Sequence, residues 1–420
     1  MKFIGIDFGT SNSLASFVQK EKIEFVRFSD NNTSNPTLIY FHEKSKMIDI
    51  GTAAVEAYLD DLEENHSVGR LMLSIKTLLP ETKFDHTIVM GHGKQTAAGL
   101  AAKFLGVLKQ LAEKQFETKF DGVVLGRPVD FSELAVSRLE EAAHLAGFKE
   151  VVFWLEPVAA AMAHEMKSTE EELLCVVDIG GGTSDICIIE TSPNRTLKPN
   201  RINDIKATQG VNLAGDAFSS QIMKYRLAER FGESSTFKSL GKTLPFPVHI
   251  INTLTSWHRI HQLNEPNTTV NLASILVSSD RPDDVERLIE LIRHHYGFEL
   301  FRAIDSAKKQ LTDNRSTYVK FAPLQLNQEI ERADFESLIQ PIASKIESAI
   351  DECLLSASVT PAQIKRVLLT GGSSQVPLIS QTISNKFGAE KIIRPDYFSS
   401  IATGLGYVAS RITNERKNLS

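Results

Sequence analysis

Two segments of the chain repeat one pattern of residues that could bind phosphate groups and a divalent cation. Residues 3–17 (FIGIDFGTSNSLASF) and 174–189 (LCVVDIGGGTSDICII) each contain an apolar run, an aspartate, a glycine turn, hydroxyl residues and a second apolar run. Each copy predicts a strand–turn–strand hairpin, and two copies in one chain predict two related lobes.

Each predicted hairpin places an aspartate, Asp7 or Asp178, where its first strand ends. Glycine permits positive φ and lets backbone N–H groups approach phosphate oxygens, while the neighbouring hydroxyls add donors. Carboxylates are suitable ligands for a hydrated Mg²⁺, so Asp7 and Asp178 are candidate metal residues. The turn residues in question are Gly9, Thr10 and Ser11 in the first copy and Gly180, Gly181, Gly182 and Thr183 in the second.

Two further glycine turns follow the same logic. Residues 367–374 (VLLTGGSS) read as a strand ending in Gly371, Gly372 and Ser373, with a helix behind it that Gly388 closes. In residues 212–218 (NLAGDAF), Gly215 opens another helix. A junction of strand, glycine and helix suits an anion or a nucleotide sugar, although each of these alone is also typical of an ordinary βα turn.

The elements between these turns are those of an α/β protein. Helices are predicted at 101–116 and from 132 to a stop at Gly147, and strands at 121–129 and 150–155. This alternation predicts mostly parallel sheets covered by helices. Glu156 ends the last of these strands, where carboxylates of such folds face the ligand crevice, and equally it could cap the helix that Pro157 begins.

Composition excludes several classes of protein. The 420 residues carry 46 basic and 52 acidic side chains, a formal charge of −6, which argues against nucleic acid as the main partner. No apolar run approaches a signal peptide or a membrane span, so we expect no membrane association. Three scattered cysteines favour the reducing cytoplasm over a disulfide framework. Cys175 and Cys187 could face each other across the second hairpin or be two small apolar strand residues, the reading we favour.

Six motifs, taken in order, resemble the nucleotide-binding domain of the seventy-kilodalton heat-shock chaperones, members of the actin and sugar-kinase superfamily. The motifs are IGIDFGTSNS, LEPVAAAMAH, VVDIGGGTSD, AIDSAKKQLT, IERADFESL and VLLTGGSSQVP, and the resemblance runs from residue 4 to about 409. It implies an α/β fold of two actin-like lobes, a duplicated ribonuclease-H-like fold, with nucleotide in the cleft between them. Lobe one would comprise residues 1–173 and 398–414, and lobe two residues 174–397.

The resemblance also implies roles for individual residues. Lys76 matches a lysine that neutralises the γ-phosphate, although alone it would be read as a surface lysine. Glu156 matches the glutamate near the metal and the attacking water. The catalytic set is then Lys76, Glu156, Asp178 and Thr183. Nucleotide contacts would come from Asp7, Gly9, Thr10, Ser11, Gly180, Gly181, Gly182, Asp185, Gly215, Asp305, Lys308, Lys309, Thr312, Gly371, Gly372 and Ser373. Spacing places Asp305, Lys308, Lys309 and Thr312 on one helix face, as in a shared site or a solvated charged stripe.

Three departures from the family pattern shape the expectations. Phe398 or Ser399 stands where the family usually has an aspartate, and residues 232–284 form an irregular insertion that fits no family motif. The chain runs into a polar tail at 415–420, so we expect no peptide-binding domain and no autonomous binding of unfolded peptides. This layout resembles that of stand-alone YegD-type chaperones.

These features together predict a chaperone-like module that binds ATP or ADP with Mg²⁺ and hydrolyses ATP slowly. A separate protein partner or co-chaperone would read the nucleotide-driven closure of its lobes. Two alternatives of the same superfamily are an actin-like filament protein and a metabolite kinase, which would require a catalytic aspartate base and a substrate pocket in lobe one.

Overall fold

The computed structural model describes residues 1–28, 32–64, 68–195, 201–395 and 399–418. The chain divides into two compact units. The first comprises Met1–Ala214, Lys345–Ser374 and Ser380–Ser420, and the second comprises Gly215–Ser344 and Gln375–Ile379. Both repeated hairpins lie in the first unit. The predicted lobe boundary after residue 173 falls inside a strand of this unit and stays a prediction.

The first sheet contains the first repeated hairpin. Its strand order is β11-β10-β1-β2-β3, and the short β4 pairs with β2. The hairpin β1–β2 is antiparallel, and β1 pairs in parallel with β10, as β10 does with β11. The strands are β1 (Phe3–Phe8), β2 (Asn12–Gln19), β3 (Lys22–Phe25), β4 (Asn35–Pro36), β10 (Gly122–Arg127) and β11 (Glu150–Leu155).

The second sheet repeats this plan. Its order is β14-β13-β12-β19-β20, with an antiparallel hairpin β12–β13 and a parallel partner, β19, on the other side of β12. The strands are β12 (Glu172–Ile179), β13 (Ser184–Thr191), β14 (Ile205–Val211), β19 (Arg366–Thr370) and β20 (Ile392–Ile393). The predicted α/β class and the duplicated hairpins are therefore confirmed. The prediction of mostly parallel sheets is wrong, because each hairpin introduces antiparallel pairs and makes both sheets mixed.

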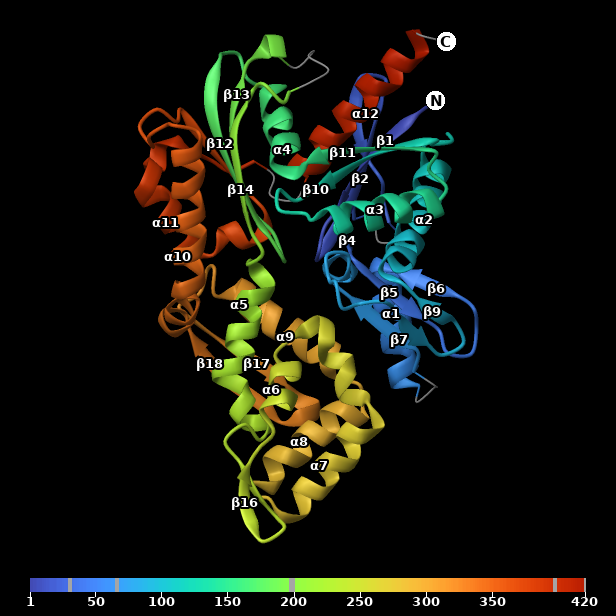
Figure 1. The fold of residues 1–420 in the computed structure, drawn as a ribbon, viewed down its shortest axis with the longest axis vertical. Coiled ribbons are helices and arrows are strands. Elements are labelled where there is room, and N and C mark those ends of the chain that lie inside the picture. Colours follow the sequence, from blue (N-terminus) through green and yellow to red (C-terminus); the bar gives the residue numbers. More distant parts are fainter. Residues whose placement is uncertain (29–31, 65–67, 196–200, 396–398, 419–420) are drawn as a thin grey trace. The chain divides into compact units, whose positions relative to one another are not determined.

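Helices cover both faces of the first sheet (Figure 1). Successive side chains of β1 point to opposite faces of the sheet. One core cluster therefore takes Ile4, Ile6 and Phe8, and another takes Phe3. Helices α2 (Ala97–Gln115) and α3 (Glu133–Leu145) pack in the first cluster. Helices α4 (Glu156–Glu165) and α12 (Ser400–Asn418) fill the second cluster, which also takes apolar side chains from β12 and β13.

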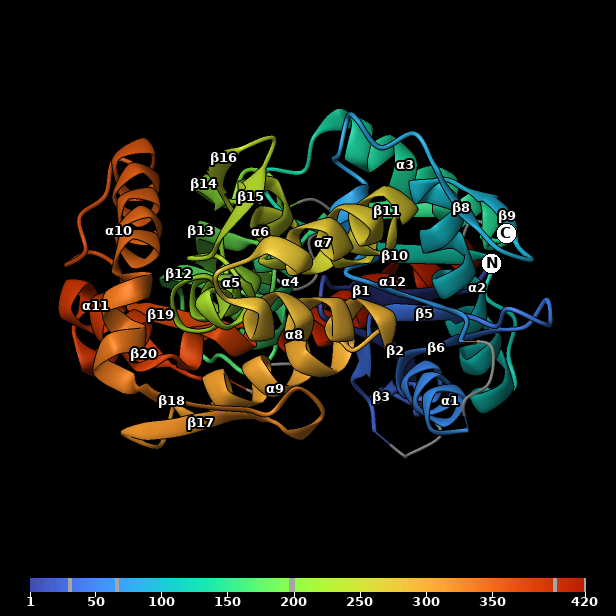
Figure 2. The same ribbon diagram turned by 90° about the horizontal axis from the view of Figure 1, so that it is seen from below.

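The rest of the first unit contains further helices and short strands. Helix α11 lies beside α10, which continues from the second unit, and Lys386 of α11 pairs with Glu347 and Asp351 of α10 (Figure 2). A three-stranded sheet of order β6-β5-β7 packs against α1. The bounds are α1 (Gly51–Glu63), β5 (Leu38–Phe41), β6 (Ile48–Ile50), β7 (Arg70–Leu73), β8 (Thr87–Val89), β9 (Gly93–Gln95), α10 (Arg332–Ser356) and α11 (Pro377–Phe387).

The second unit contains helices and two hairpins, β15–β16 and β17–β18. Its elements are α5 (Gly215–Ile222), β15 (Thr236–Ser239), β16 (Lys242–Pro245), α6 (Val248–Leu254), α7 (Pro266–Ser278), α8 (Pro282–Arg293), α9 (Gly297–Gln310), β17 (Ser316–Phe321) and β18 (Leu326–Glu331). The prediction that residues 232–284 are irregular is wrong, since this segment forms a hairpin and helices. Helix α7 escaped prediction because β-branched and polar residues fill it and its buried positions, such as Leu272 and Ile275, are few.

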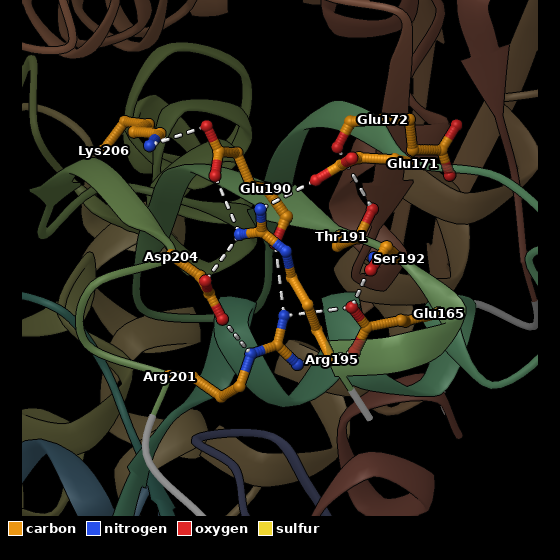
Figure 3. Close-up of polar contacts among 10 residues, drawn as sticks. All are labelled: Glu165, Glu171, Glu172, Glu190, Thr191, Ser192, Arg195, Arg201, Asp204 and Lys206. Atoms are coloured by element: carbon orange, nitrogen blue, oxygen red, sulfur yellow. Dashed lines mark hydrogen bonds and ion pairs between the residues drawn. The ribbon is translucent and has the colours of Figure 1, made fainter. Parts of the chain in front are cut away.

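A buried network of ion pairs lies at the open end of the hairpin β12–β13 (Figure 3). Glu165, the last residue of α4, accepts hydrogen bonds from the guanidinium of Arg201 (Nη1 to Oε2, 2.5 Å) and from the backbone N–H of Ser192 (2.7 Å). Arg201 also bonds Asp204 (Nε to Oδ2, 2.6 Å), and Asp204 bonds Arg195 in turn. The network fixes the end of α4 to the residues that connect β13 with β14.

The cysteines are buried free thiols. Across the second hairpin, Cys175 is opposite Ile188 and Cys187 is opposite Val176, so the two cysteines lie on opposite faces of the sheet. The prediction that they are apolar strand residues is confirmed. The alternative, that they face each other across the hairpin, is wrong. Among the described residues, no helix combines the length and the hydropathy needed to cross a bilayer.

Candidate functional site

The candidate site begins with carboxylates at the turn ends of the two hairpins. Asp7 and Asp178 are each the last residue but one of their strand, and both are buried. Asp185 is opposite Asp178 in the antiparallel register of β12 and β13, so its side chain lies on the same face of the sheet. The backbone N–H of Val129 donates to Asp185 Oδ1 (2.6 Å). The register therefore brings three of the predicted residues to the ends of the repeated strands.

Lys76 and Glu156 form a buried ion pair at this site. Lys76 lies in the short 3₁₀ helix η1 (Ile75–Leu78), Glu156 is the first residue of α4, and each is 4% exposed. Lys76 Nζ is 2.7 Å from Glu156 Oε1 and 5.8 Å from the centre of the Phe131 ring. The surface reading of Lys76 is thus excluded, and Glu156 does more than begin a helix.

The carboxyl groups of this site outnumber the ammonium group of Lys76, and the pKa values of several carboxyl groups are raised. Oxygen atoms of Glu156, Asp178 and Asp185 lie within 4.8 Å of one another. Burial, and then the charge of Glu156, raises the pKa of Asp178 well above its usual value and that of Asp185 to about 7. Burial alone would lower the pKa of the Lys76 ammonium, but Glu156 and Asp7 leave it above its usual value. Lys76 is therefore charged at neutral pH.

Two carboxylate oxygens in this group lack partners. In the part of the chain that the structure describes, Asp178 Oδ1 and Asp185 Oδ2 are buried and have no hydrogen-bond partner. Leaving a buried carboxylate oxygen unpaired costs free energy, and oxygen ligands are what Mg²⁺ prefers. The donor set thus fits a hard divalent cation. Of the two predicted metal residues, Asp178 belongs to this group, and Asp185 and Glu156 are its other members.

The site makes stability depend on pH. Burial, and then the charge of Glu156, raises the pKa of Asp7 to about 7. Between about pH 4 and 7 the folded protein then binds more protons at Asp7 and Asp185 than the unfolded chain does, so their contribution to stability falls as pH rises. Without nucleotide or divalent cations, we expect Asp7→Asn to have a higher melting temperature than the wild type at pH 8. This difference should shrink toward pH 5.5, and a difference that stays constant would contradict the assignment.

The glycine turns approach one another closely. A Cβ on Gly182 would lie 2.9 Å from Thr10 Oγ1, which places the second turn against the first. Gly9, Gly180, Gly181 and Gly182 do not adopt the positive φ that glycine permits, whereas Gly371 does. What the turns require is space: a Cβ on Gly9 would lie 2.2 Å from the carbonyl oxygen of Asn12. The glycines of both turns are half-buried.

The third glycine turn joins the second. Ser373 Oγ donates to the carbonyl oxygen of Gly180 (2.6 Å), and Gly372 begins a short 3₁₀ turn. At Gly371, φ is +78° and a Cβ would lie 2.3 Å from the carbonyl oxygen of Ile179, so no other residue fits there. The turn residues Ser11, Gly181 and Thr183 are exposed or half-buried. Of the two candidates for the missing aspartate, Phe398 lies outside the described residues and Ser399 directly precedes α12.

The predicted adenosine-binding residues lie in the second unit. The buried ammonium of Lys308 pairs with Asp305 (2.7 Å) and donates to Ser219 Oγ and the carbonyl oxygen of Gly215 (both 3.1 Å). This brings Gly215 and Lys308 together. Lys309 is exposed and pairs with Asp305 (2.8 Å). The shared helix face is only partly right, because α9 ends at Gln310 and Thr312 follows in a turn.

Sequence reasoning missed residues 129–138, which follow β10. Val129 bonds Asp185, Phe131 lies below Lys76, and Arg138 bonds the segment that carries Lys76. A signal for the first two was present, because residues at the carboxyl ends of parallel strands meet at one edge of the sheet.

The fold and the site define a class. Two mixed sheets of one topology, each with an acidic hairpin turn, together with a buried lysine between carboxylates, are consistent with an actin-like ATPase domain. A family model described as Hsp70 protein matches residues 3–240 and 295–411, and the chain belongs to this family. The expected resemblance is confirmed, and the protein is a nucleotide-binding ATPase of the chaperone type. Residues 241–294, most of the predicted insertion, lie outside the match.

Proposed function

We propose that the protein binds Mg·ATP and hydrolyses it slowly, and that a separate protein reads the resulting change between lobe arrangements. The observation that carries this proposal is the buried Lys76–Glu156 pair beside Asp7, Asp178 and Asp185, at the point where two glycine turns meet. Such a site can position a terminal phosphate and neutralise its charge, which is most of what phosphoryl transfer to water requires.

Each residue has a proposed part. Backbone N–H groups of residues 9–11 and 180–183 bind phosphate oxygens, and the hydroxyls of Thr10 and Thr183 add donors. Glu156, Asp178, Asp185 and Asp7 would hold Mg²⁺ directly or through water, and the ion would offset the charge of the phosphates. Lys76 stabilises charge on the γ-phosphate, and Glu156 orients the water that attacks it. Gly371 to Ser373 would contact the nucleotide beside the second turn, and Asp305, Lys308, Lys309 and Thr312 keep their proposed role as nucleotide contacts.

The partner remains a proposal. Differential contacts with the γ-phosphate would favour one arrangement of the lobes over another, and a second protein that prefers one of them would detect it. We also propose a reducing compartment, because Cys175, Cys187 and Cys353 are all free thiols.

Calorimetric titration with Mg·ATP and Mg·ADP tests the nucleotide proposal. We expect wild-type protein to bind both nucleotides and Gly182→Val to lose most of this affinity, because the added side chain would occupy the space against Thr10. Gly106→Val is a matched control in α2, where the nearest atom to a Cβ is 4.0 Å away. A wild-type protein that ignores both nucleotides would refute the proposal. Equal nucleotide affinity of the Gly182→Val variant and the wild type would show that the glycine turns do not bind the nucleotide.

A further inference from the structure

We infer that Arg138 is a positioning residue that holds Lys76 in place for catalysis, an inference that rests on the proposed function. Arg138 lies on α3, and its guanidinium donates to four main-chain carbonyl oxygens just after Lys76. Nη1 bonds those of Leu78 (3.2 Å), Leu79 (3.0 Å) and Glu81 (3.0 Å), and Nη2 bonds that of Phe84 (3.1 Å).

The segment that carries Lys76 is held by short-range turns of its own backbone, such as the bonds from Leu79 N–H to the Lys76 carbonyl (3.1 Å) and from Glu81 N–H to the Leu78 carbonyl (3.4 Å). Helix η1 has only four residues, a length at which 3₁₀ structure gains little from its own hydrogen bonds. Ser74, which precedes it, has φ +48° and ψ +39°, a left-handed conformation that costs free energy for a non-glycine residue. Arg138 adds a second donor to the carbonyls of Leu78 and Glu81, and it supplies a donor to the carbonyl of Leu79 at the end of the helix.

Side-chain packing fixes only part of the segment. Ile75 and Leu79 are fully buried in the first core cluster and anchor the two ends of η1. Apolar packing is not directional, whereas a guanidinium presents its N–H groups in a rigid planar fork. Arg138 therefore sets the orientation of the backbone from which Lys76 reaches Glu156.

The position of Arg138 also links Lys76 to the second hairpin. The residues that lead into α3 include Val129, which bonds Asp185, and Phe131, whose ring lies near Lys76 Nζ. One stretch of chain thus contacts the backbone around Lys76, its side chain and an acid of the second sheet. A lysine at 138 would keep the charge but not the planar fork, so it should restore the function only in part.

Chemical labelling tests the placement without relying on activity. Wild type, Arg138→Gln, Arg138→Lys and Arg287→Gln are treated with an acetylating N-hydroxysuccinimide ester, and modification of Lys76 is followed by mass spectrometry. Arg287 is the matched control, since its guanidinium donates to the carbonyl oxygens of Arg230 and Leu324 in the second unit. Lys308, which is also buried, reports on general loosening of the fold. We expect Lys76 to be labelled roughly 10-fold faster in Arg138→Gln alone, because hydrogen bonds from charged donors are the stronger class.

Turnover supplies the second readout. Arg138→Gln should lower kcat by roughly 10²-fold, as a misplacement of about 1 Å can, with ATP affinity nearly unchanged. Arg138→Lys should recover part of the loss, and in a Lys76→Ala background Arg138→Gln should cost nothing more. Unchanged labelling of Lys76, or equal increases at Lys76 and Lys308, would overturn the inference. A wild-type protein without ATPase activity would instead refute the proposed function, while the labelling would still decide the role of Arg138.

Discussion

Replacing Lys76 with alanine is expected to lower ATP turnover by roughly 10²–10³-fold while ATP still binds, the loss typical of removing one preorganised charge-stabilising donor. Lys76 is enclosed by Glu156, Asp7 and Asp185, so its charge is preserved and its position is fixed before substrate arrives. The positive charge should stabilise the γ-phosphate most in the transition state, when the bond between the β- and γ-phosphates breaks. The kcat for ATP hydrolysis should therefore fall far more than the affinity for ATP. Single-turnover hydrolysis and calorimetry on the same preparation would measure the two quantities.

The control for this variant is Lys109→Ala. Lys109 is a mostly buried lysine of α2 in the same unit, paired with Glu113 (3.1 Å). Its replacement should leave turnover within about threefold, since it makes no contact with the proposed site. Equal turnover of Lys76→Ala and wild type would show that Lys76 only balances the buried acids. A parallel loss of binding and turnover would point to collapse of the site rather than to catalysis.

Replacing Arg201 with methionine should lower the free energy of unfolding by roughly 3–5 kcal/mol, the cost of leaving a buried charge without its partner. The guanidinium of Arg201 is 1% exposed and the carboxylate of Glu165 is fully buried. Without Arg201, Glu165 keeps the backbone N–H of Ser192 but loses its counter-ion. Urea denaturation followed by circular dichroism would give the difference.

A double variant separates a stranded charge from lost packing. Replacing Glu165 with leucine in the Arg201→Met background removes the unpaired charge, so the double variant should be more stable than Arg201→Met alone. Arg416→Met breaks an exposed pair with Glu150 and should cost at most about 1 kcal/mol. If Arg201→Met costs no more than Arg416→Met, the network contributes little to stability.

Much of the fold could be predicted because its signals are local. The hairpins appear in the sequence as apolar runs around a glycine turn, and the helix that ends near Gly147 shows its amphipathic stripe and its stop signal. The pairing of strands depends on distant residues. The parallel pairing of β12 with β19 joins strands almost 200 residues apart, and nothing in either strand specifies the partner.

The candidate site shows the same division. Asp7 and Asp178 could be found from the repeat, whereas Lys76 was found only through the family resemblance. The burial of Lys76 depends on Glu156, 80 positions along the chain. Arg138 bonds main-chain carbonyl oxygens, which every residue has, so the sequence does not reveal its partners. Arginine is usually found at the surface, and Arg201 is buried only because the fold places acidic partners around it.

Helix α12 is made long after the strand β1 that it covers. It packs on β1 through glycines: a Cβ on Gly5 would lie 2.4 Å from the backbone of Gly406, and Thr413 Oγ1 accepts the N–H of Phe3 (3.0 Å). Ribosomes add roughly 5–20 residues per second, so the first strand waits on the order of 20–80 s for the helix that covers it. Until then, this face of the sheet, including Phe3 and Val124, can pack only against α4 and the other earlier members of the second core cluster. The second core cluster of the first sheet is therefore completed only after α12 has been made.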